Sequence, residues 1–244
     1  MQKVEGSIPF SRSTFQPSWG GKFQMKNLVV ITGSNRGIGL ELTKIFAKDH
    51  DVIACCRNSS PELQVLGVEI LEDMDLKNAK SFQRLSEKIG SRKISVLVNN
   101  AGILESDSLE TANQEEITEQ FYVNALGPFL LTQNLLPHFG PGSKIAFITS
   151  RMGSIADNTS GGYYGYRTSK AALNALGKSL AEDLKSKEIS VVLLHPGFVK
   201  TTMTKNQGHI EADEAAKNLF QQITRLNLKA TGSFWHSSGE ELPW

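Results

Sequence analysis

From Lys26 onward the chain alternates short apolar runs with longer stretches of helical periodicity. The apolar runs are rich in β-branched residues and lack polar alternation, which is typical of strands buried on both faces. They span residues 27–32, 52–56, 67–71, 95–100, 144–150, 189–196 and 232–235. The helical stretches span residues 39–48, 79–89, 115–136 and 169–186.

This alternation predicts an α/β fold, a doubly wound parallel sheet of about seven strands with helices on both faces. No repeat or linker interrupts the pattern, so residues 26–244 are expected to form a single domain. In such sheets ligands bind outside the carboxyl ends of the strands. Residues that follow each strand are therefore the candidates for function.

Residues 1–25 differ from the rest, because they are polar, punctuated by Gly, Pro and Ser, and without periodicity. They lack the apolar core of a secretory signal. An organelle transit segment is the alternative, since the stretch is poor in acids, but it contains a single arginine. We expect a disordered or appended N-terminal extension that takes no part in the fold.

Composition narrows the class of partner. The chain has 26 basic and 25 acidic residues and no basic cluster, which argues against a nucleic-acid partner. No run of about 18 apolar residues predicts a membrane span. The only cysteines, Cys55 and Cys56, are adjacent in an apolar run and are expected in the core. We expect a cytoplasmic protein that acts on a small molecule and holds no metal.

The first predicted strand leads directly into the turn TGSNRGIG, residues 32–39, which opens a helix. Gly33 permits the chain to reverse, Gly37 permits close approach of a pyrophosphate, and Gly39 permits close packing of the helix on the strand. The turn predicts a dinucleotide site, which also includes Asn35, Arg36 and Ile38.

Three motifs occur in order along the chain: Gly-x-x-x-Gly-x-Gly at Gly33, Asn-Asn-Ala-Gly at Asn99, and Tyr-x-x-x-Lys at Tyr166. Together they resemble the short-chain dehydrogenase/reductase family over residues 26–244. The stretch GGYYGYRTSKAALN at residues 161–174 and the ending ELPW resemble the branch of carbonyl reductase, Sniffer and C-factor proteins. The resemblance implies hydride transfer between a nicotinamide cofactor and a carbonyl or alcohol, in a homodimer or homotetramer built on the helices at residues 115 and 169.

The end of the second predicted strand indicates which cofactor binds. An NAD site normally has Asp or Glu there, about 20 residues past the glycines, for the ribose 2′-hydroxyl. This chain has Cys56, followed by Arg57, and a second arginine, Arg36, lies in the glycine turn. With no carboxylate to repel a 2′-phosphate and two cations to pair with it, NADP(H) is the predicted cofactor.

The resemblance implies further cofactor contacts. Asp75 and Leu76 would hold the adenine, and Asn99, Ala101 and Gly102 would hold the riboses. After the sixth strand, the family's Pro-Gly motif and the residues behind it would contact the nicotinamide carboxamide, here Pro196, Gly197, Val199 and Thr201. Residues 202–210 would form a substrate lid, and His195 is expected to pack at its strand end.

Reduction of a carbonyl requires a proton donor and a hydrogen-bond donor at the oxygen. Tyr166 and Lys170 lie at i and i+4 on a helix, and we expect the lysine and the positive nicotinamide ring together to lower the tyrosine's reference pKa of about 10. Tyr163 has Arg167 at the same spacing, so charge alone leaves it open. The family motif favours Tyr166 and Lys170, and implies that Asn124 supports the lysine through water.

The catalytic serine is harder to assign. The family's usual spacing places it at Gly153, which has no hydroxyl, with Ser154 and Ser150 on either side. Ser150 ends a predicted strand at the carboxyl edge, so it is the predicted hydroxyl donor, while Ser154 is expected to bond locally in its loop.

Two other functions remain open. One is a signalling or regulatory protein of C-factor or Sniffer type that binds NADP(H) with little turnover. The other is an epimerase or lyase of the extended branch, which is disfavoured because the sequence holds no additional substrate domain.

Overall fold

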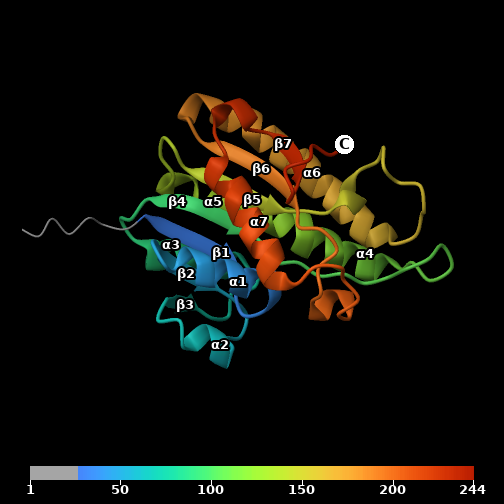
Figure 1. Cartoon of the computed structure of the whole chain (residues 1–244), viewed down its shortest axis with the longest axis horizontal. Helices are drawn as coiled ribbons and strands as arrows, with labels where there is room; N and C mark the ends of the chain where they lie inside the picture. The colour runs from blue at the N-terminus through green and yellow to red at the C-terminus, as the bar shows by residue number, and fades with distance from the viewer. Residues whose placement is uncertain (1–26) are drawn as a thin grey trace, which may run out of the picture.

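The computed structural model describes residues 27–244, which are built around a seven-stranded parallel sheet (Figure 1). The strand order is β3-β2-β1-β4-β5-β6-β7. The strands are β1 (Leu28–Thr32), β2 (Asp51–Cys55), β3 (Glu69–Leu71), β4 (Ile94–Asn99), β5 (Lys144–Ile148), β6 (Ser190–His195) and β7 (Ser233–His236). The predicted doubly wound sheet is confirmed, while the expected extension at residues 1–25 lies outside the described residues.

Helices cover both faces of the sheet. In Figure 1, α1 (Gly37–Phe46) and α7 (Ala212–Arg225) lie side by side over one face. The other face is covered by α3 (Ala79–Ile89), α5 (Gly127–Asn134) and α6 (Tyr164–Leu184). Successive strand residues point to opposite faces, so both faces need apolar side chains.

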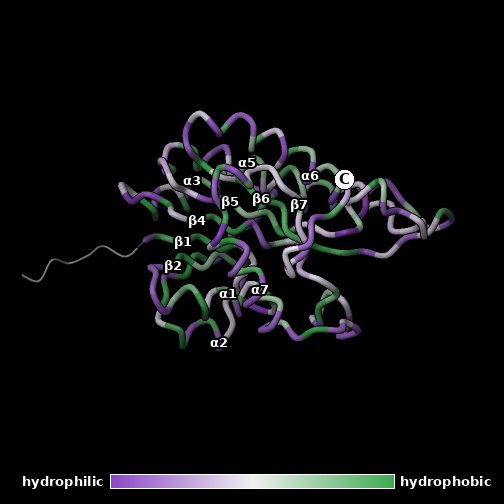
Figure 2. The backbone as a smooth tube through the Cα atoms, turned by 45° about the horizontal axis from the view of Figure 1, so that its top comes forward, coloured by the Kyte–Doolittle hydropathy of each residue, from purple (hydrophilic) through white to green (hydrophobic). Residues whose placement is uncertain are grey.

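The two apolar clusters show this alternation directly. In β1, Val29 and Ile31 belong to the cluster under α1 and α7, whereas Leu28 and Val30 belong to the cluster under α3, α5 and α6. Figure 2 shows apolar strands at the centre and more polar segments outside. Burial of both faces explains why the strands appear in the sequence as unbroken apolar runs.

The helical elements differ from the prediction in several places. Helix α2 (Pro61–Gln64) was not predicted, and α6 begins at Tyr164 and not at residue 169. The predicted helix at residues 115–136 is divided into α4 (Gln114–Phe121), a π-helical turn (Tyr122–Leu126) and α5. Helix α7 was not predicted, although Ala215, Leu219 and Ile223 recur at helical spacing on its buried face. The remaining elements are short 3-10 turns at Leu136–His138, Arg151–Gly153, Lys185–Lys187, Thr202–Thr204 and Leu228–Ala230.

The strand order reverses between β1 and β4, and hydrogen bonds join the chain segments that leave these two strands. The Thr32 hydroxyl oxygen accepts from the backbone N–H groups of Asn100 at 3.0 Å and Ala101 at 3.1 Å. The Asn100 side chain donates to the Thr32 carbonyl at 2.9 Å. Ligands bind at such a switch point, because the connections on either side diverge to opposite faces.

Thr32→Val is expected to destabilise the protein by about 1 to 3 kcal/mol, because the methyl group that replaces the hydroxyl leaves the Ala101 N–H without its acceptor. Urea denaturation measures the loss. Thr43→Val is the matched control, since the Thr43 hydroxyl only donates to the Gly39 carbonyl and no N–H depends on it. Equal losses in the two variants would contradict this role for Thr32.

Candidate functional site

A cleft of about 460 Å³ opens at the carboxyl edge of the sheet, beside the switch point between β1 and β4. Its walls include most of the predicted cofactor residues, namely Gly33, Asn35, Arg36, Gly37, Ile38, Gly39, Arg57, Asp75, Leu76, Ala101, Gly102, Lys170, Pro196 and Thr201. Residues that were not predicted as cofactor contacts also line it, among them Asn100, Ile103, Val123, Thr149 and Met203. These residues come from four segments of the chain, so no single motif contains them.

Four predicted cofactor residues do not line the cleft: Asn99, Tyr166, Gly197 and Val199. The Asn99 side chain is 2% exposed and donates to the Thr132 hydroxyl of α5 at 3.2 Å, so it points into the protein below the cleft. Its neighbour Asn100 lines the cleft in its place. Val199 is buried where the backbone pairs with Ile210.

The glycine turn forms a cradle that side chains would fill. Gly33 and Gly37 have φ angles of +69° and +54°, in the left-handed region that favours glycine. A Cβ atom on Gly39 would lie 2.1 Å from the Gly33 carbonyl oxygen. A Cβ atom on Gly37 would lie 3.3 Å from the Thr201 side chain, which faces the turn from the other wall. The cradle therefore presents backbone to the cleft at close range.

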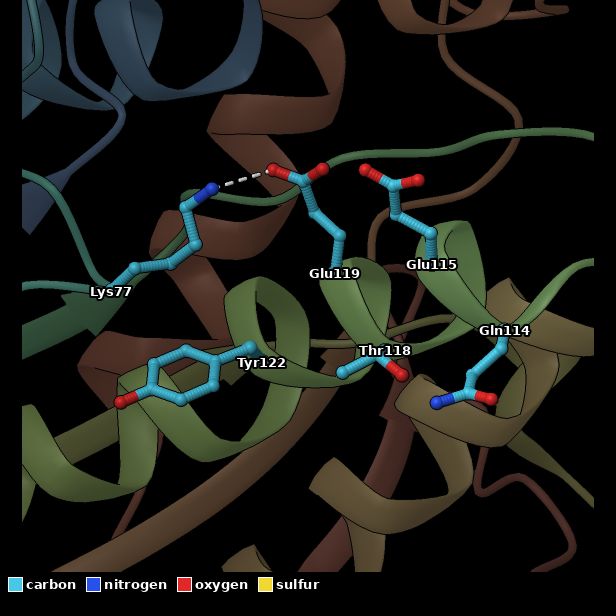
Figure 3. Close-up of a pocket in the computed structure, with 6 residues that line it drawn as sticks. All are labelled: Lys77, Gln114, Glu115, Thr118, Glu119 and Tyr122. Carbon is cyan, nitrogen blue, oxygen red and sulfur yellow. Dashed lines mark hydrogen bonds and ion pairs between the residues drawn. The ribbon is translucent and has the colours of Figure 1, made fainter.

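Cations line the end of the cleft beyond β2. Arg36 and Arg57 are exposed, and within residues 27–244 neither side chain has a hydrogen bond or ion pair. Lys77 is paired with Glu119 of α4 at 2.7 Å (Figure 3). Burial raises the pKa of Cys56 to about 11, so its thiol is uncharged at neutral pH. Arg36 of the glycine turn and Arg57 after β2 thus offer two free guanidinium groups, and Cys56 stands where an NAD site has a carboxylate.

Tyr166 and Lys170 lie in the first two turns of α6 and are 8% and 4% exposed. The Lys170 ammonium donates to the carbonyl of Ile148, the last residue of β5, at 2.9 Å. It lies 5.7 Å from the centroid of the Tyr166 ring. Ser150 follows two residues after Ile148, so strand β5 and helix α6 bring all three predicted groups to the same edge.

Burial controls the ionisation of both groups. It raises the pKa of Tyr166 to about 12, and a hydrogen bond with Ser150 offsets part of this rise. Burial also lowers the pKa of Lys170 to about 8. Desolvation of the phenolate is the main cause of the higher pKa of Tyr166. Tyr166 is therefore protonated at neutral pH. The lowering expected from Lys170 and the nicotinamide ring together stays a prediction.

The two candidate serines have different partners. Ser150 caps the 3-10 turn Arg151–Gly153 by accepting from the Met152 N–H at 3.1 Å, and its hydroxyl also affects the ionisation of Tyr166. Ser154 donates to the Trp244 carbonyl at 3.1 Å and accepts from the Asp157 N–H at 3.0 Å. Of the two, Ser150 is the serine beside Tyr166.

Gly153 occupies the position at which the family's usual spacing places a serine. A Cβ atom there would lie 2.8 Å from the backbone carbonyl carbon of Lys170. The turn after Ser150 therefore packs directly on α6, and no side chain fits at the contact.

The neighbouring tyrosines face solvent. Tyr163 and Tyr164 are 38% and 40% exposed. Arg167, the cation that left Tyr163 open as a candidate, donates to the Gly162 carbonyl and the Ser160 hydroxyl. The Arg167 guanidinium thus binds the loop before α6. Among the described contacts it has no hydrogen bond to the Tyr163 hydroxyl.

Asn124 is fully buried in the π-helical turn. Its side chain bonds both backbone groups of Ile103 at 2.8 Å and donates to the Ser169 hydroxyl at 3.0 Å. A Cβ atom on Gly102 would lie 3.0 Å from the Asn124 side-chain oxygen and 3.7 Å from the Lys170 ammonium. Asn124 thus fixes the segment that passes beside Lys170, while its predicted water relay stays a prediction.

His195 packs edge-to-face against His236, with ring centroids 5.2 Å apart. Burial and the neighbouring positive groups lower the pKa of His195 to about 3, so its imidazole ring is uncharged at neutral pH. This agrees with the packing role predicted for it.

Comparisons with known proteins identify the family. The profile described as short chain dehydrogenase matches residues 27–212. This chain is a short-chain dehydrogenase. A family member from Rhodococcus sp. (strain AD45), 1-hydroxy-2-glutathionyl-2-methyl-3-butene dehydrogenase, is 33% identical over 223 residues, which cover 88% of this chain and 99% of that protein. The C-signal protein of Myxococcus xanthus is 39% identical over 154 residues, 62% of this chain and 93% of that protein.

Solved structures of the family agree with the fold. Carbonyl reductase Sniffer of D. melanogaster superposes with a TM-score of 0.82 at 32% identity, covering 90% of this chain and all of that one. A carbonyl reductase from Pseudomonas aeruginosa PAO1 superposes with a TM-score of 0.78 at 30% identity and the same coverage. The predicted resemblance to the carbonyl reductase, Sniffer and C-factor branch is confirmed. In the part of this dehydrogenase that the structure describes, no helix is both long and apolar enough to span a membrane.

The buried lysine predicts a pH window in stability. The pKa of Lys170 falls from its ordinary 10.5 to about 8 in the folded protein. Between these values the unfolded chain holds a proton that the folded protein has lost, so stability rises with pH. Relative to Lys170→Met, the wild type is expected to gain about 3 kcal/mol between pH 8 and pH 10.5.

Urea unfolding at several pH values measures this difference. Lys178→Met, at an exposed position of the same helix, controls for loss of a lysine side chain. A difference between wild type and Lys170→Met that stays constant with pH would show that burial of the Lys170 charge has no such cost.

Proposed function

We propose that this short-chain dehydrogenase is an NADPH-dependent carbonyl reductase that converts an aldehyde or ketone to an alcohol. The observation that carries the proposal is a protonated, buried Tyr166 beside Ser150 and Lys170, and Lys170 lines the cleft that also holds Arg36 and Arg57. The family is one of oxidoreductases, which fixes the class of reaction but neither the substrate nor the direction.

The residues of the cleft fit NADP(H). The cradle at Gly33, Gly37 and Gly39 leaves room for a pyrophosphate against the backbone and the start of α1. Beyond β2, the free guanidinium groups of Arg36 and Arg57 suit a 2′-phosphate. A carboxylate would repel this phosphate, and Cys56 stands where an NAD site has one. Two similar carbonyl reductase structures, from chicken fatty liver and Pseudomonas aeruginosa PAO1, contain NADPH and NADP respectively. Asp75, Leu76, Ala101, Gly102, Pro196 and Thr201 are the remaining proposed cofactor contacts on the cleft wall.

In the proposed mechanism, bound NADPH supplies the hydride. As negative charge develops on the carbonyl oxygen, Tyr166 transfers its phenolic proton to that oxygen, and the Ser150 hydroxyl donates a hydrogen bond to it. The pKa of about 12 for Tyr166 keeps the proton in place at neutral pH, which suits reduction more than oxidation. Lys170 lies on the same helix face and stabilises the phenolate after transfer.

A homo-oligomer built on α4 and α6 remains part of the proposal. The outer side of α4 carries an open pocket of about 590 Å³ lined by Lys77, Gln114, Glu115, Thr118, Glu119 and Tyr122 (Figure 3). Sedimentation velocity of the purified protein distinguishes monomer, dimer and tetramer.

An NADPH-oxidation screen over aldehydes, ketones and quinones tests the proposed function. Oxidation with at least one of these classes is expected. The 39% identity to the C-signal protein of Myxococcus xanthus favours one competing function, a regulatory protein that binds the cofactor with little turnover. NADPH binding without oxidation of any compound would support that alternative and contradict the reductase.

Arg57→Ala is expected to weaken NADPH binding by about 1.5 to 3 kcal/mol, the scale of a hydrogen bond to a charged group, and to change NADH binding little. Fluorescence titration with both cofactors measures this split. The control is Arg84→Ala, because the Arg84 guanidinium is exposed and donates to the carbonyls of Glu72 and Asp73. Equal losses for NADPH and NADH would show that Arg57 does not bind the 2′-phosphate.

Ser150→Ala is expected to lower kcat about 10²-fold or more, the scale for losing one donor to a developing oxyanion. Tyr166→Phe is expected to be at least as damaging. Ser154→Ala and Tyr163→Phe are the matched controls and should change kcat little, because one hydroxyl bonds within the loop and the other side chain is exposed. A severe loss in Ser154→Ala together with a nearly normal Ser150→Ala would reverse the assignment of the serine.

A further inference from the structure

Helix α6, which carries Tyr166 in its first turn, is capped by a residue from a distant segment. Tyr163 occupies the N-cap position in a left-handed conformation, with φ of +53°, and makes no side-chain cap bond. Asp107 supplies the cap: one carboxylate oxygen accepts from the Tyr164 N–H and the other from the Gly165 N–H at 3.0 Å. The Asp107 carbonyl also accepts from the Tyr163 N–H at 2.9 Å.

This cap supplies acceptors for backbone N–H groups that have none within the helix. The first N–H groups of a helix have no partner inside it, and a negative charge there is stabilised by the helix dipole. The first turn of α6 contains no acidic residue. The cap of the helix that carries Tyr166 is therefore Asp107, which belongs to the segment between β4 and α4.

The segment that carries Asp107 is itself held at two points. The Gln120 side-chain oxygen accepts from the Glu105 N–H at 3.0 Å, and Asn124 bonds both backbone groups of Ile103. Gln120 and Asn124 are fully buried. The carboxylate of Asp107 thus projects from a fixed backbone.

Close packing of α4 on α6 brings these groups together. A Cβ atom on Gly165 would lie 2.5 Å from the Gln120 amide nitrogen and 3.4 Å from an Asp107 carboxylate oxygen. Any side chain at residue 165 would separate the helix from the segment that caps it. Glycine is required here by contact with a neighbouring side chain, and the contact holds the first turn of α6 in one position.

We propose that Asp107 is a positioning residue for Tyr166, whose carboxylate fixes the first turn of α6 and so the placement of the phenol. Tyr166 lies one residue after Gly165, and its backbone carbonyl accepts from the Ser169 hydroxyl, which Asn124 contacts in turn. Asp107 and Asn124 therefore hold the same turn from its two ends. Displacement of a reacting group by about 1 Å is enough to lower turnover about 10²-fold.

The test compares Asp107→Ala and Asp107→Asn with wild type, with Glu110→Ala as control. Glu110 is an exposed carboxylate in the same segment that bonds only Ser108 among the described contacts. The measurements are kcat and KM for a reducible carbonyl, the Kd of NADPH, and hydrogen exchange of the Tyr164 and Gly165 amides. The kinetic part rests on the proposed reductase function, whereas the exchange part does not.

Asp107→Ala is expected to lower kcat about 10- to 100-fold with the Kd of NADPH changed less than about threefold, since Asp107 does not line the cofactor cleft. Exchange of the two amides should accelerate. Asp107→Asn should fall between Ala and wild type, because an amide oxygen can replace only one of the two carboxylate acceptors. Glu110→Ala should match wild type in every measurement.

Normal kcat in Asp107→Ala, with accelerated exchange, would overturn the positioning role and leave a cap that only stabilises the helix. Unchanged exchange would overturn the cap itself. Should Asp107→Ala fail to fold, Asp107→Asn decides: wild-type kcat and exchange in that variant would overturn the proposal. An inactive wild type would instead refute the reductase function, and the exchange comparison would still decide whether Asp107 orders the turn that holds Tyr166.

Discussion

The hydrogen bonds between Thr32 and the segment Asn100–Ala101 fix the point from which the rest of the site is built. At this point β1 and β4 lie side by side, and their connections depart to opposite faces of the sheet. The glycine cradle begins directly after Thr32, and the wall formed by Ala101 and Gly102 begins directly after Asn100. Because both walls start from one hydrogen-bonded junction, their separation is set by the sheet and not by loops.

Burial is the second constraint, and it acts on Tyr166 and Lys170 in opposite directions. It favours the uncharged form of each group, so it raises the pKa of the phenol and lowers the pKa of the ammonium. The phenol remains a proton donor at neutral pH. The folded protein keeps a charged lysine buried at neutral pH, which costs stability at the point where the chemistry needs a cation.

Much of the fold and the site could be predicted from sequence, because strands buried on both faces leave unbroken apolar runs and functional residues follow those strands. Other features have no local signal. The π-helical turn at Asn124 lies in a stretch of uninterrupted helical periodicity, and Asp107 is a single acid whose partners are 57 and 58 positions away. The pKa of Tyr166 depends on surrounding atoms from several segments. Spacing favoured Gly153 for the serine, and only packing against Lys170 explains why a glycine stands there.

The division between helix α6 and the loop that precedes it has an evolutionary consequence. The proton donor and its lysine are anchored in a helix that contacts β5, the π-helical turn and the turn after Ser150. Ile155 and Tyr163 lie in the neighbouring loop and are exposed, where substitutions usually change stability by less than about 0.5 kcal/mol. Substitutions can therefore accumulate in the loop while Tyr166 and Lys170 keep their positions.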